Sequence, residues 1–274
     1  MSESASVIRI HPDRIITHQD FASQAKDTLL ISGTFMTIQG EGPFAGHPAF
    51  FIRMAGCNYG DKEKHCGGKG LSCDTDFRYD KGKTVHVDDL LDELRESRAK
   101  VLVLTGGEPL LQAAGIKTLL TRNMIGSETP SYGQVETNGI YLSSAIELMH
   151  HIPLHVVVSP KAHQDHGYSH THLKHTVRTM IQFPRMYLKV LIGEAPYDHV
   201  PPAVLAAPPE LNERIYLSPI TVYASAYEGE VANSWDPKLV DQETTARNHS
   251  LAAQLVLEHR YRLTMQMHNF CRIA

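Results

Sequence analysis

The chain has 274 residues, a hydrophobic fraction of 42% and a formal net charge of −4. This length suits one α/β domain of barrel type, which occupies about 200–250 residues, and the weak negative charge argues against general attraction to nucleic acid. No apolar run is long enough to span a membrane, and the first residues lack the apolar core of a secretory signal. A reducing cytoplasm is the expected compartment.

The predicted elements alternate between strands and helices. After an expected variable leader over residues 1–30, the apolar segment 49–55 predicts a buried strand, and residues 58–71 predict a loop. Val87, Leu90, Leu91 and Leu94 share one helix face. Further strands are predicted over 101–104, 134–136, 154–158, 187–192, 215–217 and 264–267, and further helices over 110–120, 142–150 and around Leu251 and Leu255.

Repeated βα units predict an α/β fold with a mostly parallel sheet, curled into a partial (β/α)6 barrel with the helices outside. We expect one domain over residues 31–274. The stretch 195–210 holds five prolines and is interpreted as an irregular surface insertion. The histidine-rich stretch 163–175 is interpreted as a solvated loop, although zinc or nickel binding is an alternative.

Three of the four cysteines are clustered: Cys57, Cys66 and Cys73 lie within 17 residues, and Cys271 stands apart. In a large chain without secretion signals, such thiols are metal ligands or inert core residues more often than disulfides. Three thiolates can bind three irons of a [4Fe–4S] cluster and leave the fourth iron open. The spacing C-x8-C-x6-C fits no common zinc pattern, although His65 could serve as a fourth zinc ligand. A cluster, a zinc site and inert thiols are all compatible with the spacing alone.

Several motifs together resemble one enzyme family. The stretch TIQGEGPFAGHPAFFIRMAGCN, with CDT at 73–75, TGGEP at 105–109, ETNG at 136–139, SPK at 159–161 and the tail QMHNFCRIA, is similar to 7-carboxy-7-deazaguanine synthases of the radical-SAM superfamily. The motifs occur in the order of the family, from residue 35 to the last residue. The cluster loop departs from the family's C-x3-C-x2-C pattern, because position 70 is glycine and the middle thiol must be Cys66.

The resemblance implies conversion of 6-carboxy-5,6,7,8-tetrahydropterin to 7-carboxy-7-deazaguanine. A radical derived from S-adenosylmethionine (SAM) takes a hydrogen atom from the pterin, the ring contracts, ammonia leaves, and SAM is regenerated with Mg²⁺ assisting. The implied enzyme is a carbon–nitrogen lyase of deazapurine or queuosine biosynthesis. A flavodoxin or ferredoxin as electron donor and a homodimer are implied as partners, and binding to nucleic acid or membranes is not expected.

The resemblance also implies site residues. The cluster ligands are Cys57, Cys66 and Cys73, and Thr75 is the magnesium ligand. SAM is expected to contact Asp74, Gly106, Gly107, Glu108, Glu136, Asn138, Ser159, Pro160, Lys161, Leu217, Ser218 and Pro219. The pterin is expected to contact Ile38, Gln39, Gly40, Glu41, Arg53, Thr105, His268 and the carboxylate of Ala274.

These residue types suit their implied tasks. The two glycines of TGGEP would allow close approach of SAM, and Glu108 would accept its ammonium group. Arg53 would pair with the substrate carboxylate, whereas Glu41 and the Ala274 carboxylate would accept N–H groups of the pterin. Each residue alone has a simpler reading: a strand-to-helix turn for TGGEP, a strand-end ion pair for Arg53 and a core histidine for His268.

Three other functions compete with this one. The first is radical-SAM chemistry on another substrate, such as glycyl-radical activation. The second is a zinc or nucleic-acid-binding module without catalysis, against which the acidic charge balance argues. The third is an inactive relative whose altered cysteine loop no longer binds a cluster.

Overall fold

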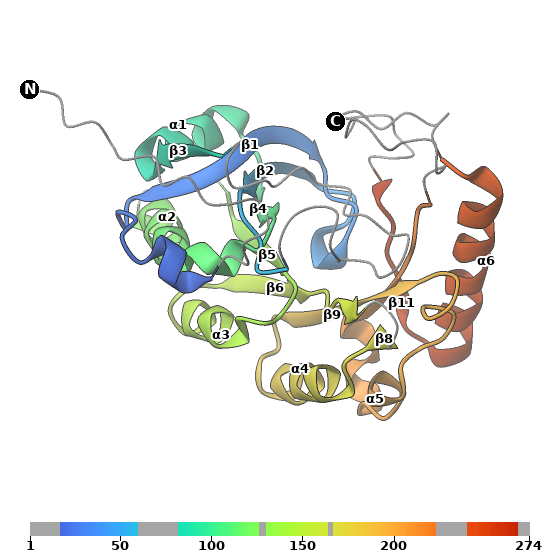
Figure 1. The fold of residues 1–274 in the computed structure, drawn as a ribbon. Helices are drawn as coiled ribbons and strands as arrows, with labels where there is room; N and C mark the ends of the chain where they lie inside the picture. Colours follow the sequence, from blue (N-terminus) through green and yellow to red (C-terminus); the bar gives the residue numbers. More distant parts are fainter. Residues whose placement is uncertain (1–16, 60–81, 126–129, 164–166, 223–239, 268–274) are drawn as a thin grey trace, which may run out of the picture.

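The computed structural model describes residues 17–59, 82–125, 130–163, 167–222 and 240–267. Its centre is a nine-stranded sheet in the order β11-β10-β9-β6-β5-β4-β2-β1-β3 (Figure 1). The strands are β1 (Thr28–Ile38), β2 (Pro48–Met54), β3 (Lys83–His86), β4 (Val101–Gly106), β5 (Tyr132–Thr137), β6 (Leu154–Val158), β9 (Met186–Ile192), β10 (Ile215–Pro219) and β11 (Arg262–Leu263). A separate two-stranded sheet pairs β7 (Ala162–His163) with β8 (Gly167–Tyr168).

Six consecutive strands of the large sheet, β2, β4, β5, β6, β9 and β10, run parallel, and β11 extends this parallel set. At the opposite edge, β1 pairs antiparallel with β2, and β3 pairs antiparallel with β1. The sheet curls but does not close, since β3 and β11 are its two edges. The predicted partial barrel with a mostly parallel sheet is therefore confirmed.

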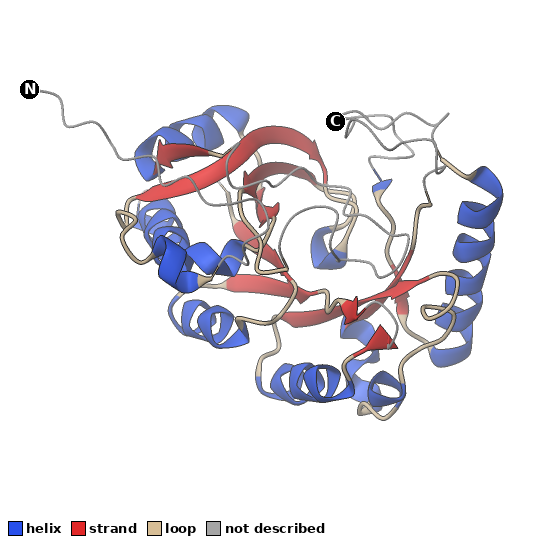
Figure 2. Cartoon of the chain, in the orientation of Figure 1, coloured by secondary structure: helices blue, strands red, loops and turns tan. Residues whose placement is uncertain are grey.

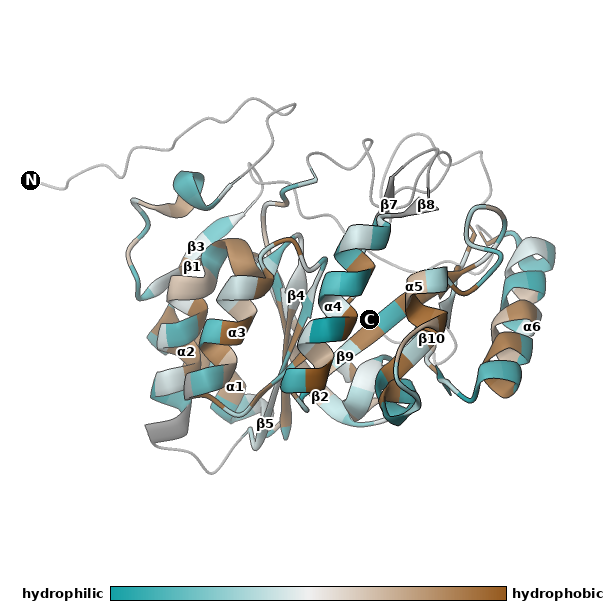
Figure 3. Cartoon of the chain, turned by 90° about the horizontal axis from the view of Figure 1, so that it is seen from below, coloured by the Kyte–Doolittle hydropathy of each residue, from teal (hydrophilic) through white to brown (hydrophobic). Residues whose placement is uncertain are grey.

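The helices lie on the outer side of the curled sheet (Figure 2). They are α1 (Val87–Ser97), α2 (Ala113–Ile125), α3 (Leu142–His151), α4 (His170–Gln182), α5 (Pro202–Leu205) and α6 (Gln242–His259). In Figure 3 apolar residues follow the strands and form stripes on α1, α2 and α3. Helix α1 shows why: it buries the predicted face of Val87, Leu90, Leu91 and Leu94.

Strand alternation separates a core-facing side from an inner side. In β9, Leu188, Val190 and Ile192 belong to the large core beneath the helices, whereas Lys189 projects to the other face. Because side chains alternate along each strand, the parallel strands together line a concave inner face. The helices thus bury one face of the sheet and leave the inner face for polar groups.

Four sequence interpretations need correction. The predicted last strand over 264–267 is wrong, because the strand is β11 at Arg262–Leu263 and the following residues leave the sheet to contact another loop. The stretch 195–210 is not irregular throughout: α5 and the 3-10 helix Pro209–Arg214 each begin with proline near the first position, where its missing N–H is harmless. Tyr197 and Val204 in this stretch are buried, as is Leu211 directly after it.

The histidine-rich stretch also differs from the interpreted loop. Helix α4 begins at His170, capped by the Ser169 side chain, and it buries Leu173, Val177 and Met180 against the core. At the N-terminal side, β1 begins at Thr28, inside the segment expected to be a leader. Within the described parts of the chain, no helix is both long and apolar enough to cross a membrane.

Candidate active site

Polar side chains gather where parallel strands end and on the inner face directly beneath. We call the turns that follow β2, β4, β5 and β6 the rim turns; they contain Cys57, Glu108, Asn138 and Ser159. We call Gln39, Glu41, Thr105, Gln134, Glu136 and Lys189 the inner polar network. In parallel α/β sheets, chemistry is placed at the carboxyl ends of the strands, where the rim turns lie, and the inner polar network lies beneath them.

The two glycines after β4 let this rim turn touch the one after β2. A Cβ on Gly106, whose φ is +115°, would lie 2.4 Å from the backbone N and O of Met54. A Cβ on Gly107 would lie 2.0 Å from the carbonyl oxygen of Gly56. Instead, Gly107 N–H donates to Met54 O at 3.1 Å. The contact that these glycines permit in the structure is therefore with the segment carrying Cys57, whereas the sequence interpretation invoked close approach of a cofactor.

Glu108 joins the turns after β4 and β5. Its side chain is fully buried, and it accepts hydrogen bonds from Leu110 N at 3.0 Å, Thr137 Oγ1 at 2.7 Å and Asn138 N at 2.8 Å. Burial raises the pKa of Glu108 to about 7, although these hydrogen bonds and nearby Lys161 oppose the rise. A carboxylate has about four lone-pair positions, and donors among the described residues occupy three of them.

An amide pair connects the rim turns to Cys57. Asn138 Nδ2 donates to Asn58 Oδ1 at 2.7 Å, and the buried Cys57 Sγ lies 3.9 Å from the same oxygen. Asn138 Oδ1 in turn accepts from Ile140 N at 3.0 Å, which fixes the turn after β5. The sequence interpretation singled out Asn138 but not Asn58.

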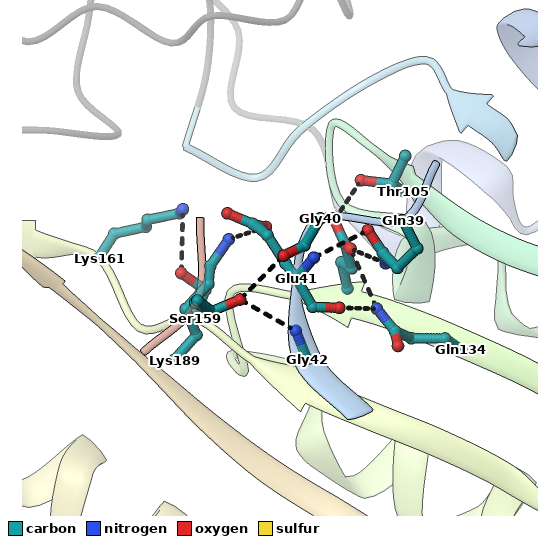
Figure 4. A network of polar contacts seen from close by, with 11 residues as sticks. Gln39, Gly40, Glu41, Gly42, Thr105, Gln134, Ser159, Lys161 and Lys189 are labelled. Atoms are coloured by element: carbon teal, nitrogen blue, oxygen red, sulfur yellow. Dashed lines mark hydrogen bonds and ion pairs between the residues drawn. The ribbon is translucent and has the colours of Figure 1, made fainter. Parts of the chain in front are cut away.

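Ser159 and Lys161 follow β6, as predicted. Ser159 N donates to Thr137 O at 2.7 Å, and Lys161 Nζ lies 3.5 Å from Ser159 Oγ (Figure 4). The three residues of β10 that were predicted to contact SAM, Leu217, Ser218 and Pro219, do not all face the same side of the sheet. The Leu217 side chain is fully buried in the core beneath the helices and therefore points away from the inner face. The alternation of β10 puts Ser218 on the inner side.

The inner polar network centres on Glu136. Its Oε1 accepts from Gln39 Nε2 at 2.9 Å and from Gln134 Nε2 at 3.1 Å, while its Oε2 accepts from Thr105 Oγ1 at 3.0 Å. Figure 4 shows these side chains converging from β4, β5 and the loop after β1. Glu136 was predicted to contact SAM together with Asn138. In the structure it is hydrogen-bonded to Gln39 and Thr105, two residues predicted for the pterin, and its predicted contact with SAM stays a prediction.

Glu41 forms an ion pair with a residue that the sequence analysis missed. Lys189 Nζ on β9 lies 2.5 Å from Glu41 Oε2, and the side chains are only 12% and 11% exposed (Figure 4). The Glu41 backbone N–H donates to Gln39 Oε1 at 3.1 Å. The signal for Lys189 was present in the sequence MYLKVLI, where one charge interrupts an apolar strand.

The QGEG loop is held by the segment after β11. Thr264 Oγ1 donates to Gly40 O at 3.2 Å and accepts from Gly42 N at 3.3 Å. A Cβ on Gly40 would lie 2.5 Å from both Met265 O and Met267 N. Glycine at position 40 is therefore required by close packing of two backbones. Ile38 ends β1 just before this loop and is partly buried.

Arg53 lies near the end of β2 without an ion pair among the described residues. Its guanidinium carbon is 4.7 Å from the centre of the Phe35 ring, and its Nε is buried without a hydrogen-bond partner there. The simpler reading of a strand-end salt bridge therefore finds no support in the described part of the chain. A buried guanidinium nitrogen without a partner is a position that favours an anionic ligand.

An apolar floor lies below the polar network. Phe44 packs against Phe51, Val101 and Val103 and makes an edge contact with His155 at 4.8 Å. His155 also lies 3.1 Å from the Tyr187 hydroxyl, and burial lowers its pKa to about 4. The QGEGPF segment thus contributes Gln39 and Glu41 to the inner polar network and Phe44 to the apolar cluster that underlies it.

Several predicted site residues lie outside the described ranges: Cys66, Cys73, Asp74, Thr75, His268 and Ala274. In the described ranges no cluster of three or more His, Cys, Asp or Glu side chains suited to a metal occurs. Of the remaining predicted residues, most belong to the two groups defined above, whereas those on β1, β2 and β10 and in the QGEG loop lie outside them: Ile38, Gly40, Arg53, Leu217, Ser218 and Pro219. Gln134, fully buried with its Nε2 donating to Glu136, is a further member that the sequence analysis missed.

No family model matches the chain. The 7-carboxy-7-deazaguanine synthase of Rhodospirillum rubrum is 30% identical over 263 residues, covering 90% of this chain and 94% of that protein. The synthase of Rickettsia prowazekii is 29% identical over 95% of this chain and 98% of its own length, and that of Halobacterium salinarum is 30% identical over 88% and 89%.

A crystal structure of QueE from Escherichia coli shares the fold with a TM-score of 0.53 and 23% sequence identity, covering 87% of this chain and 94% of that one. The fold, the order of the motifs along it and the identity over nearly the full length of the relatives agree. The chain belongs to the family of 7-carboxy-7-deazaguanine synthases.

Proposed function

We propose that the protein converts 6-carboxy-5,6,7,8-tetrahydropterin to 7-carboxy-7-deazaguanine. The reaction is inferred from family membership. The hydrogen-bonding state of Arg53 and Glu41 on the inner face supports the choice of substrate. The guanidinium of Arg53 has no ion pair among the described residues, and its Nε is buried without a hydrogen-bond partner there. The one side-chain partner of Glu41 in the same part of the chain, Lys189, uses Oε2 and leaves Oε1 for a ligand. A 6-carboxypterin carries the complementary groups, a carboxylate at one end and N–H donors at the other.

In this proposal the chain's own residues bind and orient the substrate. Arg53 pairs with the substrate carboxylate, because its planar guanidinium donates two parallel hydrogen bonds to such a group. Glu41 accepts N–H groups of the aminopyrimidine edge. Gln39, Thr105 and Glu136 are already hydrogen-bonded to one another, so they form a preorganised wall that needs little rearrangement on binding.

The rim turns fit the cofactors that the family implies. Cys57 provides a buried thiol at the strand ends, and the buried Glu108 carboxylate interacts electrostatically with Lys161, whose Nζ lies 3.5 Å from Ser159 Oγ. Cys57 would bind a [4Fe–4S] cluster with Cys66 and Cys73, and the rim turns would bind SAM. When bound, the cluster and SAM supply the one-electron chemistry that removes a hydrogen atom from the substrate.

Further properties belong to the same proposal. Thr75 would be the protein ligand of Mg²⁺, a hard cation that keeps several waters. The reaction would be that of a carbon–nitrogen lyase in deazapurine biosynthesis. A flavodoxin or ferredoxin would deliver the electron in the cytoplasm, and the protein would work as a homodimer.

The test is anaerobic reconstitution with iron and sulfide, then reduction and incubation with SAM, Mg²⁺ and 6-carboxytetrahydropterin. We expect 7-carboxy-7-deazaguanine by mass spectrometry, and its loss in a Cys66→Ala variant. Lys117→Met is a matched control, because Lys117 forms an exposed ion pair with Glu147 on the helix side. A reconstituted protein that cleaves SAM but leaves the pterin unchanged would contradict the proposed substrate. A protein that holds only zinc would contradict the radical chemistry.

A further inference from the structure

The two carboxylates of the inner polar network, Glu136 and Glu41, differ in how many further hydrogen bonds they can accept. Glu136 accepts three hydrogen bonds from protein side chains, which use both of its oxygens. Glu41 has a single side-chain partner among the described residues, Lys189, and this partner uses Oε2. Since a carboxylate offers about four lone-pair positions, Glu41 is the network carboxylate with an oxygen left for a ligand.

The Glu41–Lys189 pair is unlike the other ion pairs of the molecule. Among the described residues, every other Lys or Arg ion pair involves side chains at least 39% exposed. Such exposed pairs contribute little to stability. A pair as buried as Glu41–Lys189 loses hydration on both sides and is weak evidence for stability, so its presence calls for another role.

Holding the QGEG loop in place does not require Lys189. Gly40 and Gly42 are bonded to Thr264, and Gln134 Nε2 lies 3.4 Å from Glu41 O. The loop backbone is therefore anchored from β5 and from the segment after β11. Lys189 adds a contact to the Glu41 side chain alone, which fixes the direction of its carboxylate.

We propose that Lys189 is a positioning residue that holds the Glu41 carboxylate for the donor–donor edge of the substrate, its 2-amino group and ring N3–H. This inference rests on the proposed function and extends it to specificity. A fixed carboxylate accepts two N–H groups, whereas a 2-oxo analogue presents an oxygen there and is repelled. The Glu41–Lys189 pair thus selects 2-amino pterins over 2-oxo analogues.

The test compares binding of 6-carboxypterin, an oxidised ligand that does not react, with binding of its 2-oxo analogue 6-carboxylumazine, by fluorescence titration of the purified protein. We expect the wild-type protein to prefer the pterin. Lys189→Met should reduce this preference about tenfold or more, since an unpaired Glu41 carboxylate can turn away. Lys189→Arg keeps the charge and should retain most of the preference. Lys117→Met should bind both ligands as the wild type does.

A double-mutant cycle separates positioning from general damage. With Glu41→Gln already present, Lys189→Met should change the preference little, because the group that Lys189 positions is gone. This double variant removes both charges, so it avoids the buried unpaired carboxylate that Lys189→Met alone would leave. If that carboxylate prevents Lys189→Met from folding, the comparison of Lys189→Arg with the wild type replaces the single methionine variant.

The outcomes distinguish the inference from the function. If Lys189→Met weakens the binding of both ligands equally, or leaves the preference for the pterin unchanged, the assigned role of Lys189 is overturned. Product formation by the wild type would still support the proposed function. A wild-type protein that neither binds 6-carboxypterin nor forms the product overturns both.

Discussion

Asn138 Nδ2 donates to Asn58 Oδ1 at 2.7 Å, and this hydrogen bond joins rim turns that are 80 residues apart in the sequence. The same Asn58 oxygen is the neighbour of Cys57 Sγ, and the Asn138 backbone N–H is bonded to Glu108. One amide pair therefore links the thiol, the buried carboxylate and the turn after β5. Breaking this hydrogen bond should change the reactivity of the Cys57 thiol.

Asn58→Ala should lower the free energy of unfolding by about 1–2 kcal/mol, because it leaves the Asn138 amide without its acceptor. It should also speed alkylation of Cys57 by iodoacetamide, followed by peptide mass spectrometry. Asn212→Ala is the matched control, since Asn212 donates to His259 O at 3.2 Å far from the rim. Equal Cys57 alkylation in wild type and Asn58→Ala would show that the link does not protect the thiol.

Gly107→Ala should destabilise the protein by several kcal/mol, because its Cβ would lie 2.0 Å from the Gly56 carbonyl oxygen and the backbone would have to move. Gly33→Ala is the control, with no atom within 4 Å of its Cβ. Urea unfolding measures both. Iron content after reconstitution should fall for Gly107→Ala in parallel, since the displaced segment carries Cys57. Similar stability for the two variants would contradict the packing argument.

Replacing Arg53 tests the carboxylate contact. Arg53→Met should weaken binding of 6-carboxypterin by about 10- to 100-fold, because the anion loses a bidentate partner. Arg53→Lys should recover only part of this loss, since an ammonium cannot reproduce the fork. Binding of pterin without the carboxyl group, titrated by fluorescence, should change little in either variant. A comparable loss of affinity for 6-carboxypterin and for pterin would show that Arg53 contacts the ring and not the carboxylate.

His155 should make the protein less stable as the pH falls. Its pKa is lowered from 6.5 to about 4 by burial, so the unfolded chain binds a proton between these values that the folded protein does not. Stability from this residue is full above pH 6.5 and is lost as the pH falls toward 4. His155→Phe keeps the ring contact with Phe44 and removes the titration.

Glu108 changes the stability in the opposite direction as the pH falls. The His155→Phe variant must therefore be compared with the wild type at each pH. Its pKa is raised from 4.5 to about 7, so the folded carboxyl binds the extra proton and this residue gains stability as the pH falls from 7 to 4.5. Both proteins contain Glu108, so the difference in Tm between them reports His155. The Tm of the wild type should fall relative to His155→Phe below pH 6.5. Parallel Tm curves would contradict the assigned shift.

Much of the fold could be predicted because its core strands and helices carry simple patterns. Val101–Gly106 is a short apolar run between turns, and α1 shows an apolar residue at each turn of one face. The eleven-residue strand β1 was missed because its exposure does not alternate regularly and its register shifts between Ile31 and Gly33. Helix α4 was hidden by its histidines, although Leu173, Val177 and Met180 have helical spacing.

The rim turns could be predicted because contiguous motifs mark them. Asn58, Gln134 and Lys189 could not, because each is a single polar residue whose role depends on strands that meet only in the fold. A sequence signal existed for Lys189, a single charge within the apolar strand MYLKVLI. Gln134 lies in β5, YGQVET, where other polar residues surround it and it does not stand out. The hydrogen bonds of Glu136 with Gln39 and Thr105 likewise depend on strands that meet only in the fold.

The bonds from Thr264 to Gly40 and Gly42 span 224 and 222 positions of the chain. On the ribosome, the QGEG loop is made early, yet its backbone partners emerge only after almost every other strand has been synthesised. The backbone geometry of the QGEG loop is therefore completed only after Thr264 has been synthesised. A nascent chain that stops before Thr264 would carry the motifs of the site without the geometry to use them.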